Sequence, residues 1–225
     1  MEKKVSVIIP AFNEEERIGE TVRASFKIPG VKEVLVVDDG STDNTYQEAA
    51  KAGARVIKLT QNRGKGKAIE AGAQEFTGDF VVLLDGDLGS SAAWAEKLLN
   101  PLLSGEADMV IARFGKARKK GGVGLVKKLT RWGLKLFTGQ VIDAVLSGQR
   151  AFTRESFLAL LPLSPGYALE FGMTVDALKK GYRIVEVPVE MTHRETGRDL
   201  KGFLHRGKQF RDILKEIFKR KFTGE

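Results

Sequence analysis

The chain has 225 residues, 42% of them hydrophobic and 29% charged, a balance that excludes a disordered chain and suffices for one large core. It has no cysteine, which excludes disulfide bonds, zinc-thiolate sites and thiol nucleophiles and fits a reducing, cytoplasmic environment. Residues 1–112 carry 13 Lys and Arg against 18 Asp and Glu, and residues 113–225 carry 24 against 11, so net charges of −5 and +13 give the total of +8.

Short β-branched runs alternate with helical patterns, which predicts an α/β fold around a largely parallel sheet. The first run is followed by Pro10 and acidic residues, so it indicates a strand and not a signal peptide. No window approaches the roughly 20 apolar residues needed to cross a membrane. The expected strands are residues 5–9, 33–37, 54–59, 80–84 and 108–112.

Helix starts can be predicted between these strands. Asn13 with Glu16 has the spacing of a capping box, and Asp43 begins a second helix that ends at Gly53. A third helix follows the glycine and lysine residues of "NRGKGKAIEAG", residues 62–72, where backbone N–H groups and a positive helix end suit a phosphate. This is not a Walker A loop, because no Ser or Thr follows its second lysine.

The second half begins with "GKARKKGGVG", residues 115–124, which predicts a mobile loop. Helices are expected near residues 125–138, 154–161, 168–180 and 200–220. The last one carries an apolar stripe of Phe203, Phe210, Ile213, Leu214, Ile217 and Phe218. Such a stripe predicts core packing or a homodimer contact, and peripheral contact with an anionic membrane remains an alternative.

We expect a single domain over residues 1–225, with a nucleotide-binding half at 1–112 and an acceptor-binding half at 113–225. The basic second half should attract an anionic partner. Nucleic acid is not expected, because the sequence lacks helix-turn-helix, RNP-like and zinc-finger spacings.

Polar clusters follow the expected strands, where ligands bind in an open parallel sheet. The first strand leads into Pro10-Ala11-Phe12-Asn13-Glu14 and the second into Asp38-Asp39, groups that suit the hydroxyls and ring nitrogens of a nucleoside. Helix capping is the alternative for Asn13 and Asp43.

The fourth strand runs into two carboxylates in "FVVLLDGDLGSS", residues 80–91. Taken alone, Asp85-Gly86-Asp87 is also typical of a turn. Two close carboxylates repel unless a cation joins them, and Mg²⁺ or Mn²⁺ bound to a diphosphate is the natural partner.

Four stretches, "VSVIIPAFNEEERI", "VLVVDDGSTDNT", "NRGKGKAI" and "VVLLDGDL", resemble family 2 and related glycosyltransferases in their order. The resemblance implies the GT-A fold, a Rossmann-like, mostly parallel sheet flanked by helices, with C-terminal helices on the acceptor side. It implies that Asp85 and Asp87 bind Mg²⁺ or Mn²⁺. The implied nucleotide-binding residues are Pro10, Ala11, Asn13, Glu14, Asp39, Lys65, Asp85 and Gly86.

The second half, in "LSGQRAFTRESFLALLPLSPGYALEFGMTVD" and "VEMTHRETGRD", resembles the glucosyl-3-phosphoglycerate synthases. This implies retaining transfer of glucose from UDP-glucose to 3-phosphoglycerate, with His193 as the third protein ligand of the metal. Catalytic roles would fall to Glu170, Asp87 and Lys65. The implied acceptor or sugar residues are Leu146, Ser147, Gly148, Tyr167, Glu170, Arg194 and Arg198.

Several alternatives remain open. Apart from the family resemblance, His193 is typical of a surface histidine after the VPVEM strand. Glu170 is then typical of an acid at a helix N-terminus or of a general base. The glycines, valine and leucine of "GGVGLVKKLT" and the acid Glu195 depart from the synthase pattern, which leaves the acceptor open. A polyprenyl-phosphate glycosyltransferase is the competing enzyme class, and a nucleotidyltransferase or a non-catalytic sugar-nucleotide binding module are the others.

Overall fold

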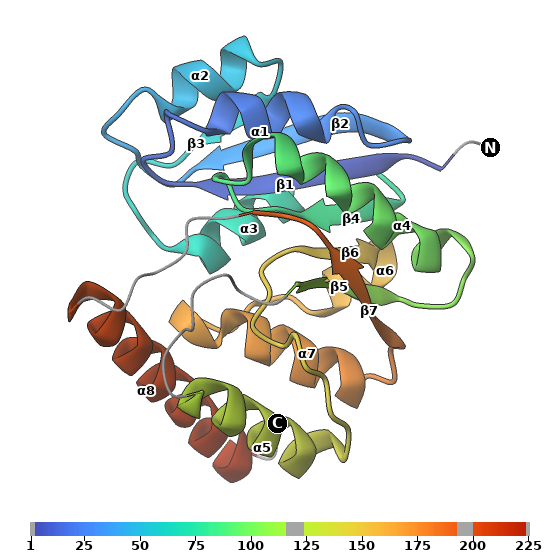
Figure 1. Ribbon diagram of the computed structural model, residues 1–225, viewed down its shortest axis with the longest axis vertical. Coiled ribbons are helices and arrows are strands. Elements are labelled where there is room, and N and C mark those ends of the chain that lie inside the picture. Colours follow the sequence, from blue (N-terminus) through green and yellow to red (C-terminus); the bar gives the residue numbers. More distant parts are fainter. Residues whose placement is uncertain (1–2, 116–123, 193–199, 224–225) are drawn as a thin grey trace.

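The computed structural model describes residues 3–115, 124–192 and 200–223, in which seven strands form one sheet (Figure 1). The sheet order is β3-β2-β1-β4-β6-β5-β7, and only β6 runs antiparallel to its neighbours. The strands are β1 (Val5–Ala11), β2 (Val31–Asp38), β3 (Arg55–Lys58), β4 (Phe80–Leu83), β5 (Met109–Phe114), β6 (Arg150–Thr153) and β7 (Ile184–Val189). Residues 116–123, nearly all of the predicted mobile loop, lie outside the described ranges.

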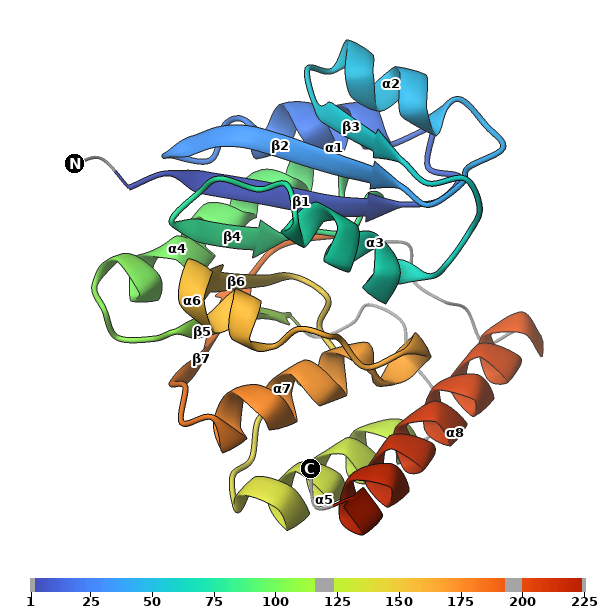
Figure 2. The ribbon, with the colours of Figure 1, turned by 180° about the vertical axis from the view of Figure 1, so that it is seen from behind.

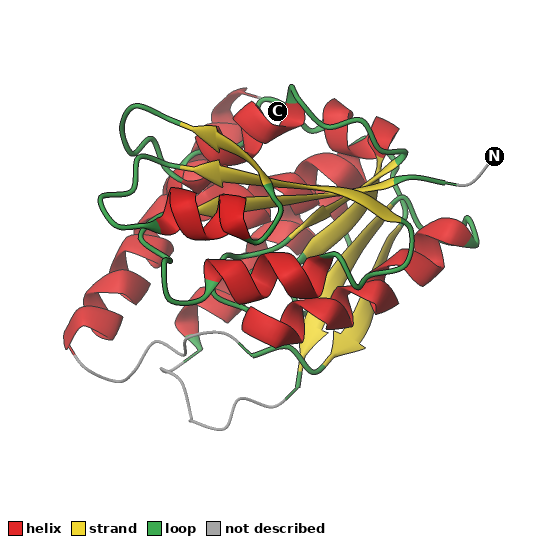
Figure 3. Ribbon diagram, turned by 90° about the horizontal axis from the view of Figure 1, so that it is seen from above, coloured by secondary structure: helices red, strands yellow, loops and turns green. Residues whose placement is uncertain are grey.

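Helices lie on both faces of the sheet (Figures 2 and 3). The helices are α1 (Ile18–Ser25), α2 (Thr45–Lys51), α3 (Lys65–Ala73), α4 (Glu96–Leu103), α5 (Leu125–Thr138), α6 (Arg154–Ala159), α7 (Leu169–Lys179) and α8 (Leu200–Thr223), with short 3₁₀ helices η1 (Gly89–Ala95) and η2 (Gly166–Ala168). One face of the sheet packs against α1, α2 and α4. The other packs against α3, α6 and α7, and α5 and α8 add to that layer.

The central strands are continuous apolar runs because both of their faces are buried. In β1, Val7 and Ile9 point into the core beneath α1, whereas Ile8 between them points into the core beneath α3. Gly72 brings α3 close to β1, since a Cβ atom there would lie 2.8 Å from Ile8 Cγ2. The predicted α/β sheet is therefore confirmed, and the structure adds that residues of β1 alternate between two cores.

One predicted helix start is wrong. Asn13 adopts a left-handed φ of 55° and does not cap a helix, because its side-chain oxygen accepts the N–H of Thr42 from the neighbouring loop. As a result α1 begins only at Ile18. The other start is close to the prediction, since Asp43 accepts the N–H of Thr45 at the beginning of α2.

The order of the strands reverses beside β1. From β1 the chain moves outward to β2 and β3, then returns to place β4 on the other side of β1. A crevice forms at such a switch point, outside the carboxyl ends of the two strands. Pro10 and Ala11 of β1 and Asp85 after β4 are located there.

The C-terminal stripe is divided between core and surface. Ile213 and Ile217 of α8 are buried, as predicted for core packing, whereas Phe218 is 52% exposed. The side chain of Phe203 lies outside the described part of the chain. In the ranges that the structure describes, no helix combines the length and apolarity needed to cross a bilayer.

Candidate active site

A cavity of about 310 Å³ opens at the switch point between β1 and β4. It joins residues from the loops after β1, β2 and β4 with the beginning of α3. Its lining residues are Pro10, Ala11, Phe12, Glu14, Asp39, Asn62, Gly64, Lys65, Asp85, Gly86 and Asp87. Nearly all of the residues predicted to bind the nucleotide therefore meet around one cavity.

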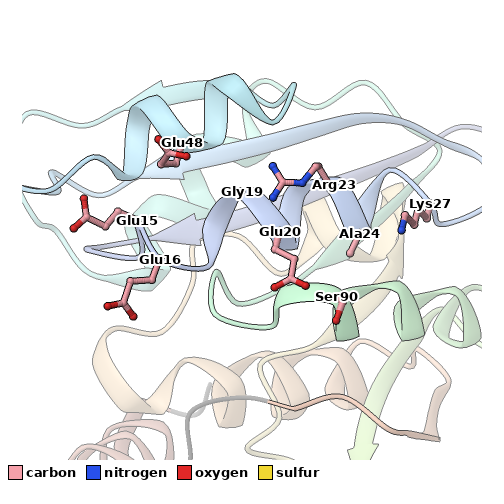
Figure 4. Close-up of a pocket in the computed structure, with 9 residues that line it drawn as sticks. All are labelled: Glu15, Glu16, Gly19, Glu20, Arg23, Ala24, Lys27, Glu48 and Ser90. Atoms are coloured by element: carbon pink, nitrogen blue, oxygen red, sulfur yellow. The ribbon is translucent and has the colours of Figure 1, made fainter.

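A larger hollow of about 530 Å³ lies beside α1, away from this crevice (Figure 4). Four acidic side chains border it, those of Glu15, Glu16, Glu20 and Glu48. Arg23 and Lys27 border it as well, but the hollow lies beside α1, and none of the residues predicted to bind the nucleotide lines it. The larger hollow is therefore not the candidate site, and the smaller cavity at the switch point is.

Side-chain hydrogen bonds join the loops that follow β1 and β2. The N–H of Asn13 donates to Ser41 Oγ at 2.9 Å, and Asn13 Oδ1 accepts the N–H of Thr42 at 2.9 Å. The N–H of Glu14 donates to Thr45 Oγ1 at 2.8 Å. Asn13 and Glu14, predicted to bind the nucleotide, thus help to fix the rim of the cavity through these bonds.

Asp39 fixes the loop that precedes α3. Its carboxylate, only 3% exposed, accepts the backbone N–H groups of Arg63 and Gly64, both at 2.8 Å. Its own N–H donates to Ala11 O at 2.8 Å. Both carboxylate oxygens therefore bind backbone, and contact of this residue with a base or ribose stays a prediction.

Lys65, the first residue of α3, lies between two carboxylates. Its Nζ is 2.7 Å from Asp85 Oδ1 and 3.0 Å from Glu170 Oε1. Burial alone would lower the pKa of Lys65, but the charges of Asp85 and Glu170 outweigh it and raise that pKa above its ordinary value. The Lys65–Asp85–Glu170 cluster thus carries a permanent cation at the edge of the cavity.

Predicted acceptor residues contact this cluster from the segment before β6. A Cβ atom on Gly148 would lie 3.1 Å from Asp85 Oδ2, so glycine allows this close approach. Gln149, which sequence reasoning missed, donates from Nε2 to Asp85 Oδ2 at 2.6 Å. Ser147 Oγ is buried and has no hydrogen-bond partner within the described residues, as expected of a group that a ligand could bind.

Arg150 is a second residue that sequence reasoning missed. Its guanidinium is fully buried and donates to the backbone oxygens of Ser147, Val145 and Glu170 at 2.8, 2.6 and 2.9 Å. Burial lowers the pKa of Arg150 to about 10, against the opposing charge of Glu170, so it remains a cation at neutral pH. Arg150 therefore holds the Ser147 loop against the first turn of α7. The single arginine in "LSGQR" does not by itself predict this role.

The Asp85-Gly86-Asp87 turn is attached to α1. Thr21 Oγ1 donates to Gly86 O at 2.9 Å, and Arg17 Nη1 donates to Asp87 O at 3.1 Å. Backbone oxygens make these bonds, and the partly buried carboxylates of Asp85 and Asp87 border the cavity. Hard carboxylate oxygens beside a cavity for a diphosphate fit Mg²⁺ or Mn²⁺.

A complete protein ligand set for the metal is not formed by the described residues alone, among which no three His, Asp or Glu side chains cluster suitably. His193, the third predicted ligand, and the predicted acceptor residues Arg194 and Arg198 lie outside those ranges. Tyr167 is in η2, with its N–H 3.5 Å from Asp212 Oδ2, and Leu146 packs partly buried against the core.

Comparison with known proteins decides the family. Residues 6–156, more than half of the chain, match the model of Glycosyl transferase family 2. The chain belongs to this family. The expected fold is confirmed by glucosyl-3-phosphoglycerate synthase of Mycobacterium tuberculosis, whose structure with Mn²⁺, UDP and glucosyl-3-phosphoglycerate aligns with a TM-score of 0.80 and 30% identity over 97% of this chain and 80% of that one.

Relatives of this family 2 glycosyltransferase bear different names. Glycosyltransferase AglJ of Haloferax volcanii is 36% identical over 87% of this chain, and dolichol-phosphate mannosyltransferase of Pyrococcus furiosus is 30% identical over 99% of it. The chain spans 65% of the length of each of these two relatives. The names of these relatives all refer to sugar transfer or to a glucosylated product, and they do not name a common substrate.

Proposed function

We propose that this family 2 enzyme transfers a hexose, preferably glucose, from a nucleoside diphosphate sugar, preferably UDP-glucose, to a small anionic acceptor such as 3-phosphoglycerate or a related glycerate. The observation that carries the proposal is the Lys65–Asp85–Glu170 cluster beside the switch-point cavity. The cluster brings together Lys65 as a cation for the diphosphate, Asp85 as a carboxylate for the metal and Glu170 as a carboxylate for the sugar. Relatives solved with UDP and Mn²⁺ support the donor and the ion.

Asp85 and Asp87 would hold Mg²⁺ or Mn²⁺, with His193 as the third protein ligand. The ion, when bound, neutralises charge that develops on the leaving diphosphate. Lys65 adds a second positive charge, and its raised pKa keeps that charge at every physiological pH. The N-terminus of α3, at Lys65, directs backbone N–H groups toward the same region.

Glu170 would position the hydroxyl groups of the donor sugar. Its carboxylate already binds Lys65, and its backbone oxygen accepts a bond from Arg150. A carboxylate held in this way supports a positioning role over removal of the acceptor's proton. We therefore favour retention of the anomeric configuration.

The test is a thermal-shift panel of UDP-, GDP- and ADP-sugars with and without Mn²⁺, followed by product analysis with 3-phosphoglycerate. We expect UDP-glucose with Mn²⁺ to raise the melting temperature most, and Asp87→Asn to abolish the part of the shift that depends on the metal. Product formation with an α linkage would support retention. Donor binding without any transfer or hydrolysis would instead favour a non-catalytic binding module.

A polyprenyl phosphate is the second candidate acceptor. The observation that favours it is the exposed, basic and apolar surface of α5 and α8, which suits a lipid environment. The same product assay, run with a short polyprenyl phosphate in detergent, separates the two acceptors. Transfer to the lipid but not to 3-phosphoglycerate would replace the first candidate by the second.

A further inference from the structure

The outer surface of α5 exposes large apolar side chains. Leu125, Trp132 and Leu136 are 56%, 56% and 49% exposed. Their spacing of seven and four residues places them on one side of the helix. Leu134 on another side is fully buried in the core. The exposed apolar stripe is therefore additional to the face that α5 buries in the core.

A matching stripe lies on α8. Phe218 and Phe222, one turn apart, are 52% and 82% exposed. Ile217, beside Phe218, packs against α5, where a Cβ atom on Gly133 would lie 2.6 Å from Ile217 Cδ1. Since Trp132 is next to Gly133 in the sequence, both stripes border the contact between the two helices, which run side by side (Figures 1 and 2). We call this surface the α5–α8 face.

The charged side chains around the α5–α8 face are predominantly basic, and α5 contains no acidic residue. The exposed basic residues are Lys127, Lys128, Arg131 and Lys135 on α5 and Lys208, Arg211, Lys215, Lys219 and Lys221 on α8. Asp143, after α5, pairs with Arg131 at 2.7 Å.

The two acids of α8 have partners away from the exposed stripe. Glu216 is buried and binds Arg220 at 2.7 Å and Ser164 at 2.8 Å. Asp212 pairs with its neighbour Arg211 at 3.1 Å and lies 3.5 Å from the N–H of Tyr167. The aromatic side chains of the face are thus surrounded mainly by positive charge.

We propose that the α5–α8 face docks on an anionic lipid bilayer. Exposed Trp, Phe and Leu side chains insert at the headgroup boundary, and the surrounding Lys and Arg side chains bind lipid phosphates. A second copy of the chain is the poorer occupant, because a two-fold dimer through this face would oppose two basic surfaces. Charge complementarity selects the bilayer.

The docked face would lie on the acceptor side of the enzyme. Asp212 of α8 lies within 3.5 Å of Tyr167 in η2, and α7 with Glu170 follows directly. The helix that carries part of the α5–α8 face thus packs on another side against the predicted acceptor half of the site. The inference adds a membrane surface to the proposed function, but its test needs neither donor nor acceptor, so either can fail alone.

The test uses Trp132 as its own reporter. The chain has two tryptophans, and Trp94→Phe leaves only the one on the α5–α8 face. We expect its fluorescence to shift to shorter wavelength with vesicles of phosphatidylcholine plus phosphatidylglycerol, and not with phosphatidylcholine alone. Added salt should weaken the effect, because basic residues contribute through screened charge.

Two paired variants separate the apolar and the basic contributions. The affinity for anionic vesicles should fall by about tenfold or more in the double variant Phe218→Ser, Phe222→Ser. It should fall by about the same factor in the double variant Lys128→Glu, Lys135→Glu. The matched control is Leu103→Ser on α4, a residue that is also 56% exposed, which should bind like the parent. An unchanged far-UV circular dichroism spectrum with a cooperative thermal transition shows that a variant is folded.

Equal binding to neutral and anionic vesicles would overturn the proposal. So would equal losses in the control and in the face variants, or an absence of vesicle binding by the parent protein. A concentration-dependent dimer that the Phe218 and Phe222 changes abolish, without vesicle binding, would assign the face to a second copy of the chain.

Discussion

Lys65 binds Asp85 and Glu170, whereas Lys67, two residues later in the same helix, pairs with Glu70 at 2.6 Å. The two lysines therefore form a matched pair with one member at the cavity. Lys65→Met should lower kcat by about 10² to 10³, as expected for removal of a positioned cation. Lys67→Met should leave kcat nearly unchanged, and steady-state kinetics with the preferred donor compares them. Equal losses in both variants would contradict the assigned role.

Glu33 provides a test of stability at the residue scale. Burial raises its pKa, but hydrogen bonds from Ser6 and Thr77 outweigh this and hold the pKa below its ordinary value of 4.5. The ionised form thus stabilises the fold above pH 4.5, and this contribution disappears as the pH falls through the lowered pKa.

Glu33→Gln should therefore make the free energy of unfolding less dependent on pH below 4.5. Urea titrations at a series of acidic pH values measure this, with the exposed Glu106→Gln as control. If the acid limbs of Glu33→Gln and the parent coincide, the hydrogen-bonded carboxylate does not contribute as described.

At the scale of elements, close packing decides what a glycine tolerates. Gly72 of α3 faces Ile8 of β1, so Gly72→Ala should destabilise the protein by about 1 to 3 kcal/mol through overpacking. Gly207 in α8 is exposed and has nothing within 4 Å of an added Cβ, so Gly207→Ala should stabilise by about 0.5 to 1 kcal/mol. Thermal unfolding should shift in opposite directions, and a common sign would disprove this packing argument.

Arg150 illustrates how an element positions a site. It belongs to β6, the strand without a predicted counterpart, and its guanidinium joins the Ser147 loop to Glu170 of α7. Pairing of β6 with β4 and β5 places Arg150 opposite Leu83, two residues before Asp85, and opposite Ile111. The placement of the Ser147 loop at the site therefore depends on a sheet contact between the two halves of the sequence.

At the scale of the molecule, the sheet interleaves the two halves, because β6 from the second half pairs with β4 and β5 from the first. This supports the proposed single domain and predicts one cooperative unfolding transition. In urea, the fluorescence of Trp94 reports the first half, and far-UV circular dichroism is dominated by the helices. In the Trp132→Phe protein, which keeps Trp94 alone, the unfolding midpoints measured by fluorescence and by circular dichroism should coincide. Two separate transitions would indicate two domains.

The sequence by itself determined which segments form the main strands and helices, since β-branched apolar runs, glycine stops and polar strand ends are local patterns. It also determined the family motifs, and with them most of the residues around the cavity. Only the tertiary structure decided that Lys65 pairs with both Asp85 and Glu170 and that Arg150 is buried and binds the backbone of Ser147 and Glu170. It also decided that Asn13 joins two loops without capping a helix, and that α5 and α8 share an exposed apolar face. The reason is physical: these contacts depend on strand order and helix packing between residues far apart in the chain, which no local pattern specifies.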